Sequence, residues 1–85
     1  MTKAEVIAAF DAAAPLDIRC RSQDFFEAHG ERRLEIGFDA PSLGLEGFAA
    51  CPCPTDDDIP EAVRGLALLA HEWIQMKRRK IASNV

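Results

Sequence analysis

Residues 51–61, CPCPTDDDIPE, carry the side chains in this sequence best suited to metal or redox chemistry: two cysteines and a run of three aspartates. Zinc sites usually combine a Cys-x(2–4)-Cys pair with a second pair of ligands, and dithiol redox centres use Cys-x-x-Cys. A single proline separates Cys51 from Cys53, so neither spacing is met. The aspartates lack the alternating ligands and the glycine of a calcium loop. We therefore predict a stiff hinge between a strand and a helix, with no metal and no cofactor.

The two histidines have no evident catalytic partners. The segment HEWIQ begins like a metalloprotease helix, but Gln75 stands where the second zinc-binding histidine would be needed. His29 falls in a predicted turn and His71 on the outer side of a predicted helix, with no nucleophile evident beside either. The sequence also has no phosphate-binding loop and no dinucleotide fingerprint. We therefore predict that the protein is not an enzyme.

Length and composition predict one small folded domain spanning residues 1–85. The 48% apolar and 28% charged fractions are ordinary for a globular chain of 85 residues. A net charge of −4 gives no long-range attraction to phosphate backbones or to anionic membranes. The N-terminal segment does not read as a leader, and no apolar run approaches the roughly 20 residues that span a bilayer. Three cysteines cannot all pair within one chain, which favours free thiols in the cytoplasm.

The N-terminal segment predicts a short helix that Pro15 ends. Thr2 and Glu5 have the spacing of a capping box, in which each satisfies a free backbone N–H group at the helix start. The apolar residues on one side of this helix include Val6, Ile7 and Phe10.

Residues 16–26 and 32–39 alternate with the period of two that is typical of half-buried strands. The inward side chains would be Leu16, Ile18, Cys20, Ser22, Leu34, Ile36 and Phe38. A three-residue turn ending at Gly30 keeps these residues on one face. The expected cross-strand pairs are Arg19 with Asp39, Cys20 with Phe38, Ser22 with Ile36, and Phe25 with Arg33. This register turns Asp24 toward the core, so we expect a bulge near Phe25 and Phe26.

Residues 45–51 predict a third strand at an edge, because the prolines that follow cannot donate ladder hydrogen bonds. Its small residues suggest close contact with a helix. That helix is predicted from Asp58, paired with Glu61 in a second capping box, to Ile81. Its length of about 36 Å exceeds the roughly 20 Å of a six-residue strand, so residues 77–85 extend beyond the core. Its core face would contain Ile59, Ala62, Val63, Leu66, Leu69, Ala70, Trp73 and Ile74.

The element order predicts a two-layer α+β domain, α-β-β-β-α, with a three-stranded antiparallel meander and both helices packed on one face. This order is similar to that of double-stranded RNA-binding domains, and His29 lies in the first hairpin turn, where that family carries a histidine. In that family lysines at the start of the second helix bind phosphate. The second helix here begins DDDIPE, so the resemblance covers the layout and not the binding residues.

The leading functional hypothesis is a non-catalytic protein-binding module, such as an accessory, adaptor or inhibitor protein. A homodimer through the long C-terminal helix is one form of it. Another is a phage-type inhibitor whose acids occupy a basic groove meant for nucleic acid. The predicted partner-binding residues are Arg64, Leu68, Glu72, Gln75, Asp56, Asp57 and Asp58.

The alternative is weak nucleic-acid binding through basic side chains of the last helix and the sheet. These residues are Lys77, Arg78, Arg79, Lys80, Arg19, Arg21 and Arg33. It is the less favoured hypothesis because the chain is acidic overall and because it lacks the exposed aromatic residues that single-strand binders place among their basic residues, apart from a possible Phe25 next to Arg33. A ligand carrier or small enzyme with a pocket between helices and sheet has the least support at this length.

Overall fold

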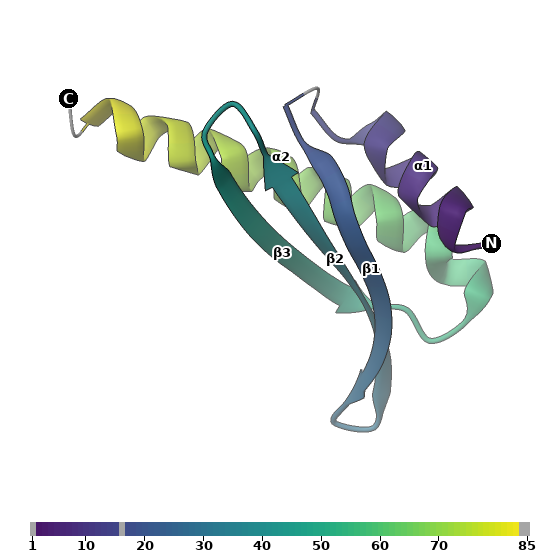
Figure 1. Ribbon diagram of the computed structural model, residues 1–85. Helices are drawn as coiled ribbons and strands as arrows, with labels where there is room; N and C mark the ends of the chain where they lie inside the picture. The colour runs from purple at the N-terminus through teal and green to yellow at the C-terminus, as the bar shows by residue number, and fades with distance from the viewer. Residues whose placement is uncertain (1, 16, 84–85) are drawn as a thin grey trace.

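The structure, a computed structural model, describes residues 2–15 and 17–83. The elements are α1 (Lys3–Ala13), β1 (Arg19–Ala28), β2 (Glu31–Ala40), β3 (Leu45–Pro52), a 3-10 turn η1 (Asp56–Asp58) and α2 (Ile59–Ser83). The strands form one antiparallel sheet in the order β1-β2-β3, and both helices lie on the same side of it (Figure 1). The predicted fold class is confirmed. Within the described residues, no helix is long and apolar enough to cross a membrane.

Helix α1 begins with the predicted capping box. The backbone N–H of Glu5 donates to Thr2 Oγ1 at 3.2 Å, and the Glu5 carboxylate accepts from the Thr2 backbone. Val6 and Phe10 are buried. The helix ends because Ala14, which precedes Pro15, adopts the extended conformation that a following proline favours.

The β1–β2 hairpin has a two-residue turn, so the predicted three-residue turn is wrong. His29 and Gly30 both have positive φ angles, 55° and 75°. A turn of this kind matches the right-handed twist of the strands and holds Ala28 opposite Glu31. Phe25 therefore faces Leu34 and not Arg33.

A bulge at Arg21 then restores the predicted register in the half of the hairpin that lies away from the turn. The pairing shifts between Cys20 and Ser22, so Cys20 faces Phe38 as expected, while Ser22 faces Gly37 and not Ile36. The extra residue moves Ser22 to the open face of the sheet, and it also turns Asp24 outward. The bulge was expected near Phe25 and Phe26, so its predicted position is wrong. Leu16 lies outside the described residues.

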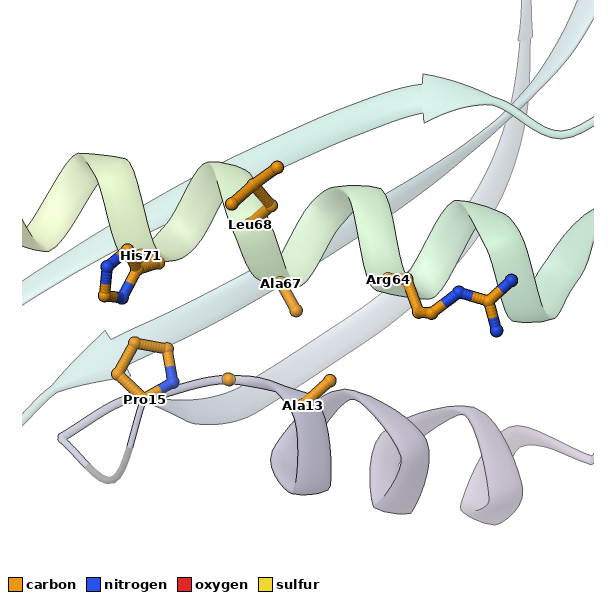
Figure 2. Close-up of a pocket in the computed structure, with 7 residues that line it drawn as sticks. Ala13, Pro15, Arg64, Ala67, Leu68 and His71 are labelled. Atoms are coloured by element: carbon orange, nitrogen blue, oxygen red, sulfur yellow. The ribbon is translucent and has the colours of Figure 1, made fainter.

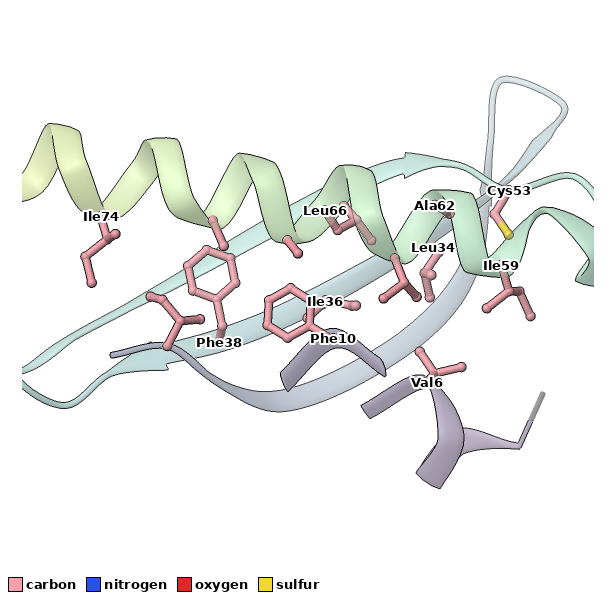
Figure 3. Close-up of a cluster of buried hydrophobic side chains, with 14 of the residues drawn as sticks. Val6, Phe10, Leu34, Ile36, Phe38, Cys53, Ile59, Ala62, Leu66 and Ile74 are labelled. Atoms are coloured by element: carbon pink, nitrogen blue, oxygen red, sulfur yellow. The ribbon is translucent and has the colours of Figure 1, made fainter. Parts of the chain in front are cut away.

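Strand β3 is the predicted edge strand, and its small residues allow α2 to pack closely against it. A Cβ atom on Gly47 would lie 2.8 Å from the Phe38 ring and 3.0 Å from Trp73 Cε2. Trp73 stands edge-on to Phe38, with ring centroids 5.1 Å apart. Around this contact the core fills the space between the sheet and the helices (Figure 3). Its fully buried larger side chains are Val6, Phe10, Ile18, Leu34, Ile36, Phe38, Cys53, Ile59, Val63, Leu66 and Ile74.

Residues 51–61 form the predicted hinge, held by a residue that sequence reasoning overlooked. Arg32 Nε donates to the Cys53 carbonyl at 2.7 Å, and Arg32 Nη2 lies 3.0 Å from Asp56 Oδ1. The capping box forms one turn earlier than predicted. Thr55 Oγ1 donates to the Asp58 carboxylate at 2.8 Å, so Asp58 pairs with Thr55 and not with Glu61.

Helix α2 buries a face that is rotated from the predicted one. Leu69, expected in the core, is 45% exposed, whereas Ala67 is only 3% exposed. The rotation arises because α1 packs against one flank of α2 and nothing within the described chain covers the other. The last turns of α2 run past the sheet, as its length predicted (Figure 1).

Candidate functional site

A groove of about 410 Å³ lies between the C-terminal end of α1 and the middle of α2 (Figure 2). Apolar and small side chains make up most of its lining. The lining residues are Ala13, Ala14, Pro15, Arg64, Ala67, Leu68 and His71. The groove therefore combines residues from two segments that are far apart in the sequence.

The groove exists because α1 presents small side chains as it ends. Ala13 and Ala14 fill little space beside α2, and Pro15 directs the chain away toward β1. On α2, Arg64, Leu68 and His71 recur at the three- and four-residue spacing that places them on one side of a helix. Because α1 is short and rich in alanine, it leaves this groove beside the longer α2 at the point where α1 stops.

The groove is apolar inside and basic at its rim. Leu68 is 59% exposed although it adjoins this apolar lining. Arg64 and His71 are the charged or titratable side chains that line it. No ion pair engages Arg64 within residues 2–15 and 17–83. An apolar side chain carried next to a carboxylate would complement both features.

Of the predicted partner-binding residues, the structure places Arg64 and Leu68 together in this groove. Glu72 is exposed elsewhere on α2, and the Gln75 carbonyl accepts a hydrogen bond from Arg79 Nε at 3.4 Å. Neither Glu72 nor Gln75 lines the groove.

The three predicted aspartates lie in the hinge and have different environments. Asp56 forms the ion pair with Arg32, and Asp58 caps the turn through Thr55. Asp57 is exposed, and no described residue bonds to its carboxylate. Two of the three carboxylates therefore stabilise the start of α2.

The predicted nucleic-acid residues separate into two surfaces. On α2, Arg78 pairs with Asp17 in the α1–β1 connection, and the ammonium group of Lys77 lies 5.9 Å from the Trp73 ring centroid. Arg79 and Lys80 are exposed near the end of this helix. The sheet arginines lie instead on the face that the helices leave open.

The open sheet face mixes arginines with acids around an exposed aromatic ring. Arg21 Nε lies 3.1 Å from Asp39 and 3.3 Å from Glu46, and its guanidinium stacks 5.2 Å above the Phe48 ring. Phe48 is 64% exposed and was not singled out from the sequence, although its alternation with Gly47 and Ala49 could have placed it there. The two remaining sheet arginines also have interactions of their own: Arg33 lies 3.8 Å from Glu31, and Arg19 donates to the Ile18 carbonyl.

The cysteines are free thiols. Burial, with a contribution from the nearby Asp11 carboxylate, raises the pKa of Cys20 above its ordinary value of 9.0. Burial likewise raises the pKa of Cys51, with a smaller contribution from Cys53. Cys53 itself is fully buried. In the part of the chain that the structure describes, no three His, Cys, Asp or Glu side chains are grouped to hold a metal ion.

Comparison of the chain with protein-family models, with curated proteins and with solved structures finds no match. Inferences about function therefore depend on the geometry of this chain.

Proposed function

We propose that the protein is a non-catalytic protein-binding module whose α1–α2 groove receives a short segment of a partner protein. The observation that carries this proposal is Leu68, a 59% exposed leucine beside an apolar groove with a basic rim. Covering such a side chain removes apolar surface from water, which is favourable by about 25 cal/mol per Å². Arg64 and His71 select the chemistry of the partner, which presents an apolar side chain next to an Asp, a Glu or a C-terminal carboxylate.

An adaptor or inhibitor acting by surface complementarity fits this small groove, and free thiols are consistent with action in a reducing compartment such as the cytoplasm. The hinge acids are a less supported contact surface, because Asp56 and Asp58 already bond to Arg32 and Thr55.

Selection from a random peptide library tests the proposal, with the wild-type protein and three variants as baits. We expect the enriched peptides to combine an apolar residue with an adjacent carboxylate. Their binding should be lost with Leu68→Asp and with Arg64→Glu, and it should persist with Phe48→Asp, which changes a similarly exposed residue in the sheet layer. Enrichment of peptides without a carboxylate, or binding that survives Leu68→Asp, would contradict the proposal.

Weak binding of single-stranded nucleic acid is a second candidate, favoured by one observation: Phe48 and Phe26 stand on the open sheet face beside arginines. Exposed rings next to cations can stack on bases. Acidic side chains share this face, including Asp39 and Glu46, which already pair with Arg21. Fluorescence anisotropy with labelled oligonucleotides at low salt tests this candidate. Binding that weakens steeply with salt and is lost in Phe48→Asp would support it, and unchanged anisotropy would exclude it.

A further inference from the structure

We propose that the free edge of β3 and the flank of α2 beside it bind a second copy of this chain, forming a two-fold symmetric dimer with one continuous sheet. This surface lies on the opposite flank of α2 from the groove that α1 borders. The proposal does not depend on what the groove binds.

The two edges of the sheet differ in how they are protected. At the β1 edge, the Cys20 N–H donates to the Asp11 carboxylate at 2.8 Å, and the bulge at Arg21 interrupts the strand. Bulges, charges and covering groups are the usual means by which proteins prevent an edge strand from pairing. Strand β3 has one charged residue, Glu46, and a regular register along its whole length. It is the edge open to pairing.

The hydrogen-bonding direction along β3 follows from its ladder with β2. The Cys53 N–H donates to the Arg32 carbonyl at 3.0 Å, immediately beyond the paired residues. Because alternate residues of an antiparallel strand bond to the same neighbour, the odd-numbered residues of β3 face β2. The backbone groups of Glu46, Phe48 and Ala50 therefore point outward.

These outward groups are self-complementary about Phe48. When two copies of β3 pair antiparallel around this residue, Phe48 meets its own copy, and Glu46 meets Ala50 of the second copy. No like charges stand opposite each other, and aromatic pairs stabilise such contacts. Pro52, which has no N–H group to donate, falls opposite Gly44, just outside the second strand.

An exposed apolar flank of α2 lies beside this edge. Gly65 borders a hollow with Cys51, and Leu69 and Met76, 45% and 52% exposed, follow on the same side of the helix. Helix α2 runs antiparallel to β3, since Trp73 approaches Gly47 while the Cys51 thiol reaches the Ala62 carbonyl. Leu69 therefore lies close to the level of Phe48 and of the proposed two-fold axis.

The strand pairing brings the two copies of α2 together along this flank. Helices pack about 8–10 Å apart and strands about 4.8 Å apart, so two helices that each cover a pair of strands make contact across the new sheet. Leu69 then meets its own copy, with α2 of one protomer antiparallel to α2 of the other.

The same arrangement gives Met76 a place to insert. A hollow of about 370 Å³ lies where α2 meets the end of β3, and Gly65 and Ala62 form its helical side. In the antiparallel pair, Met76 of the second copy falls opposite these two residues. Methionine adapts well to irregular apolar spaces.

Charge complementarity identifies a second copy as the occupant. The hollow has acids at its rim, Asp58 and Glu61, near the start of α2. The antiparallel pairing sets beside them the basic end of α2 of the second copy, with Lys77 and Lys80. The opposed helix dipoles add to this attraction. Because α2 is acidic at its first turns and basic at its last, a copy of itself is its electrostatic complement.

Sedimentation velocity over a series of protein concentrations tests the dimer. We expect the wild-type protein to sediment with twice its 9.3 kDa chain mass. Leu69→Asp and Met76→Glu should each raise the dimer dissociation constant by roughly tenfold or more. Leu68→Asp is the matched control, because it places the same charge about 100° around the same helix, at a side chain that lines the α1–α2 groove, and should leave the dimer intact. Circular dichroism checks that each variant is folded.

A charge exchange tests the antiparallel orientation. Glu61→Lys and Lys80→Glu should each weaken the homodimer, and an equimolar mixture of the two variants should form heterodimers more readily than either forms homodimers. A wild-type protein that stays monomeric at submillimolar concentration would overturn the proposal. So would a dimer that Leu68→Asp disrupts and Leu69→Asp does not, or an exchange in which the mixture gains nothing.

Discussion

The two flanks of α2 differ in how far the rest of the chain covers them. On the α1 flank, Ala67 is 3% exposed and Arg78 is paired with Asp17. On the β3 flank, Leu69 and Met76 are 45% and 52% exposed beside an unprotected strand edge. Apart from the groove where α1 stops, the closed flank is stabilised within the chain, whereas the open flank has apolar side chains, a hollow and charges beside a free strand edge.

Removing the residue that anchors α1 should have the largest effect, because it opens the closed flank. Phe10 is fully buried and lies 6.2 Å from the Phe38 ring centroid. Phe10→Ala should lower the free energy of unfolding by about 3–5 kcal/mol, a large part of the stability of so small a domain. Urea unfolding measures this change. Leu68→Ala, at an exposed position, should stay within about 0.5 kcal/mol of wild type, and equal losses in both variants would contradict the assignment of the core.

Enlarging a residue on the closed flank should have the next largest effect. Ala67→Leu adds volume where α1 and α2 already touch, so we expect a loss of about 1–3 kcal/mol from overpacking. The same urea titration measures it. A neutral or stabilising Ala67→Leu would mean that the larger side chain is accommodated in the α1–α2 groove, and would contradict tight packing of α1 on α2 at this residue.

Filling the hollow on the open flank should make the monomer more stable and the dimer weaker. A Cβ atom on Gly65 would have no atom within 4 Å beyond the adjoining backbone of its own helix, so Gly65→Ala should stabilise the monomer by about 0.5–1 kcal/mol through helix propensity. The added methyl group occupies space that the dimer assigns to Met76 of the second copy, so the dimer should weaken. Urea unfolding in the monomeric Leu69→Asp background measures the first effect, and sedimentation of Gly65→Ala alone measures the second. Tighter association in Gly65→Ala would contradict the packing.

Raising the pH should have the smallest effect, and it should act through Cys20, beside α1, and Cys51, beside the first turns of α2. Cys20 and Cys51 have folded-state pKa values above their ordinary value of 9.0. Their contribution to stability is therefore complete below pH 9 and is lost as the pH rises through the folded-state values, because the unfolded chain releases these protons first. Unfolding free energies on either side of pH 9 check this. The Cys20→Ala/Cys51→Ala double variant should fall less steeply, and an equal or steeper fall would contradict the thiol assignment.

The alternation of apolar residues was enough to predict the strands, their order and the layer that the helices form. Leu34 and Ile36 are both fully buried, as the period of two required. The hairpin turn was mispredicted because residue types allowed both a two- and a three-residue loop. Asp24, which the predicted register turned inward, indicated the error. In the structure the bulge at Arg21 allows Cys20 to face Phe38 while Asp24 faces Glu35 and points outward.

The candidate surfaces were less predictable because they depend on which elements lie beside α2. Helical periodicity gave a broad apolar face that included Leu69, but it could not show that α1 would cover Ala67 and leave Leu69 exposed. The groove likewise depends on where α1 stops relative to Leu68, which is a tertiary relation. Arg32 had no local signal, since the carbonyl and carboxylate that it contacts lie more than 20 residues away.

Hydrogen exchange at individual backbone amides tests most directly whether the open flank is an interface. The N–H groups of Glu46, Phe48 and Ala50 point away from β2, so the monomer leaves them exposed to water, while those of Gly47 and Ala49 bond within the sheet. We predict that the three outward amides become protected as the protein concentration rises, and that Leu69→Asp removes this protection. Outward amides that exchange freely at every concentration, while Gly47 and Ala49 remain protected, would contradict the account.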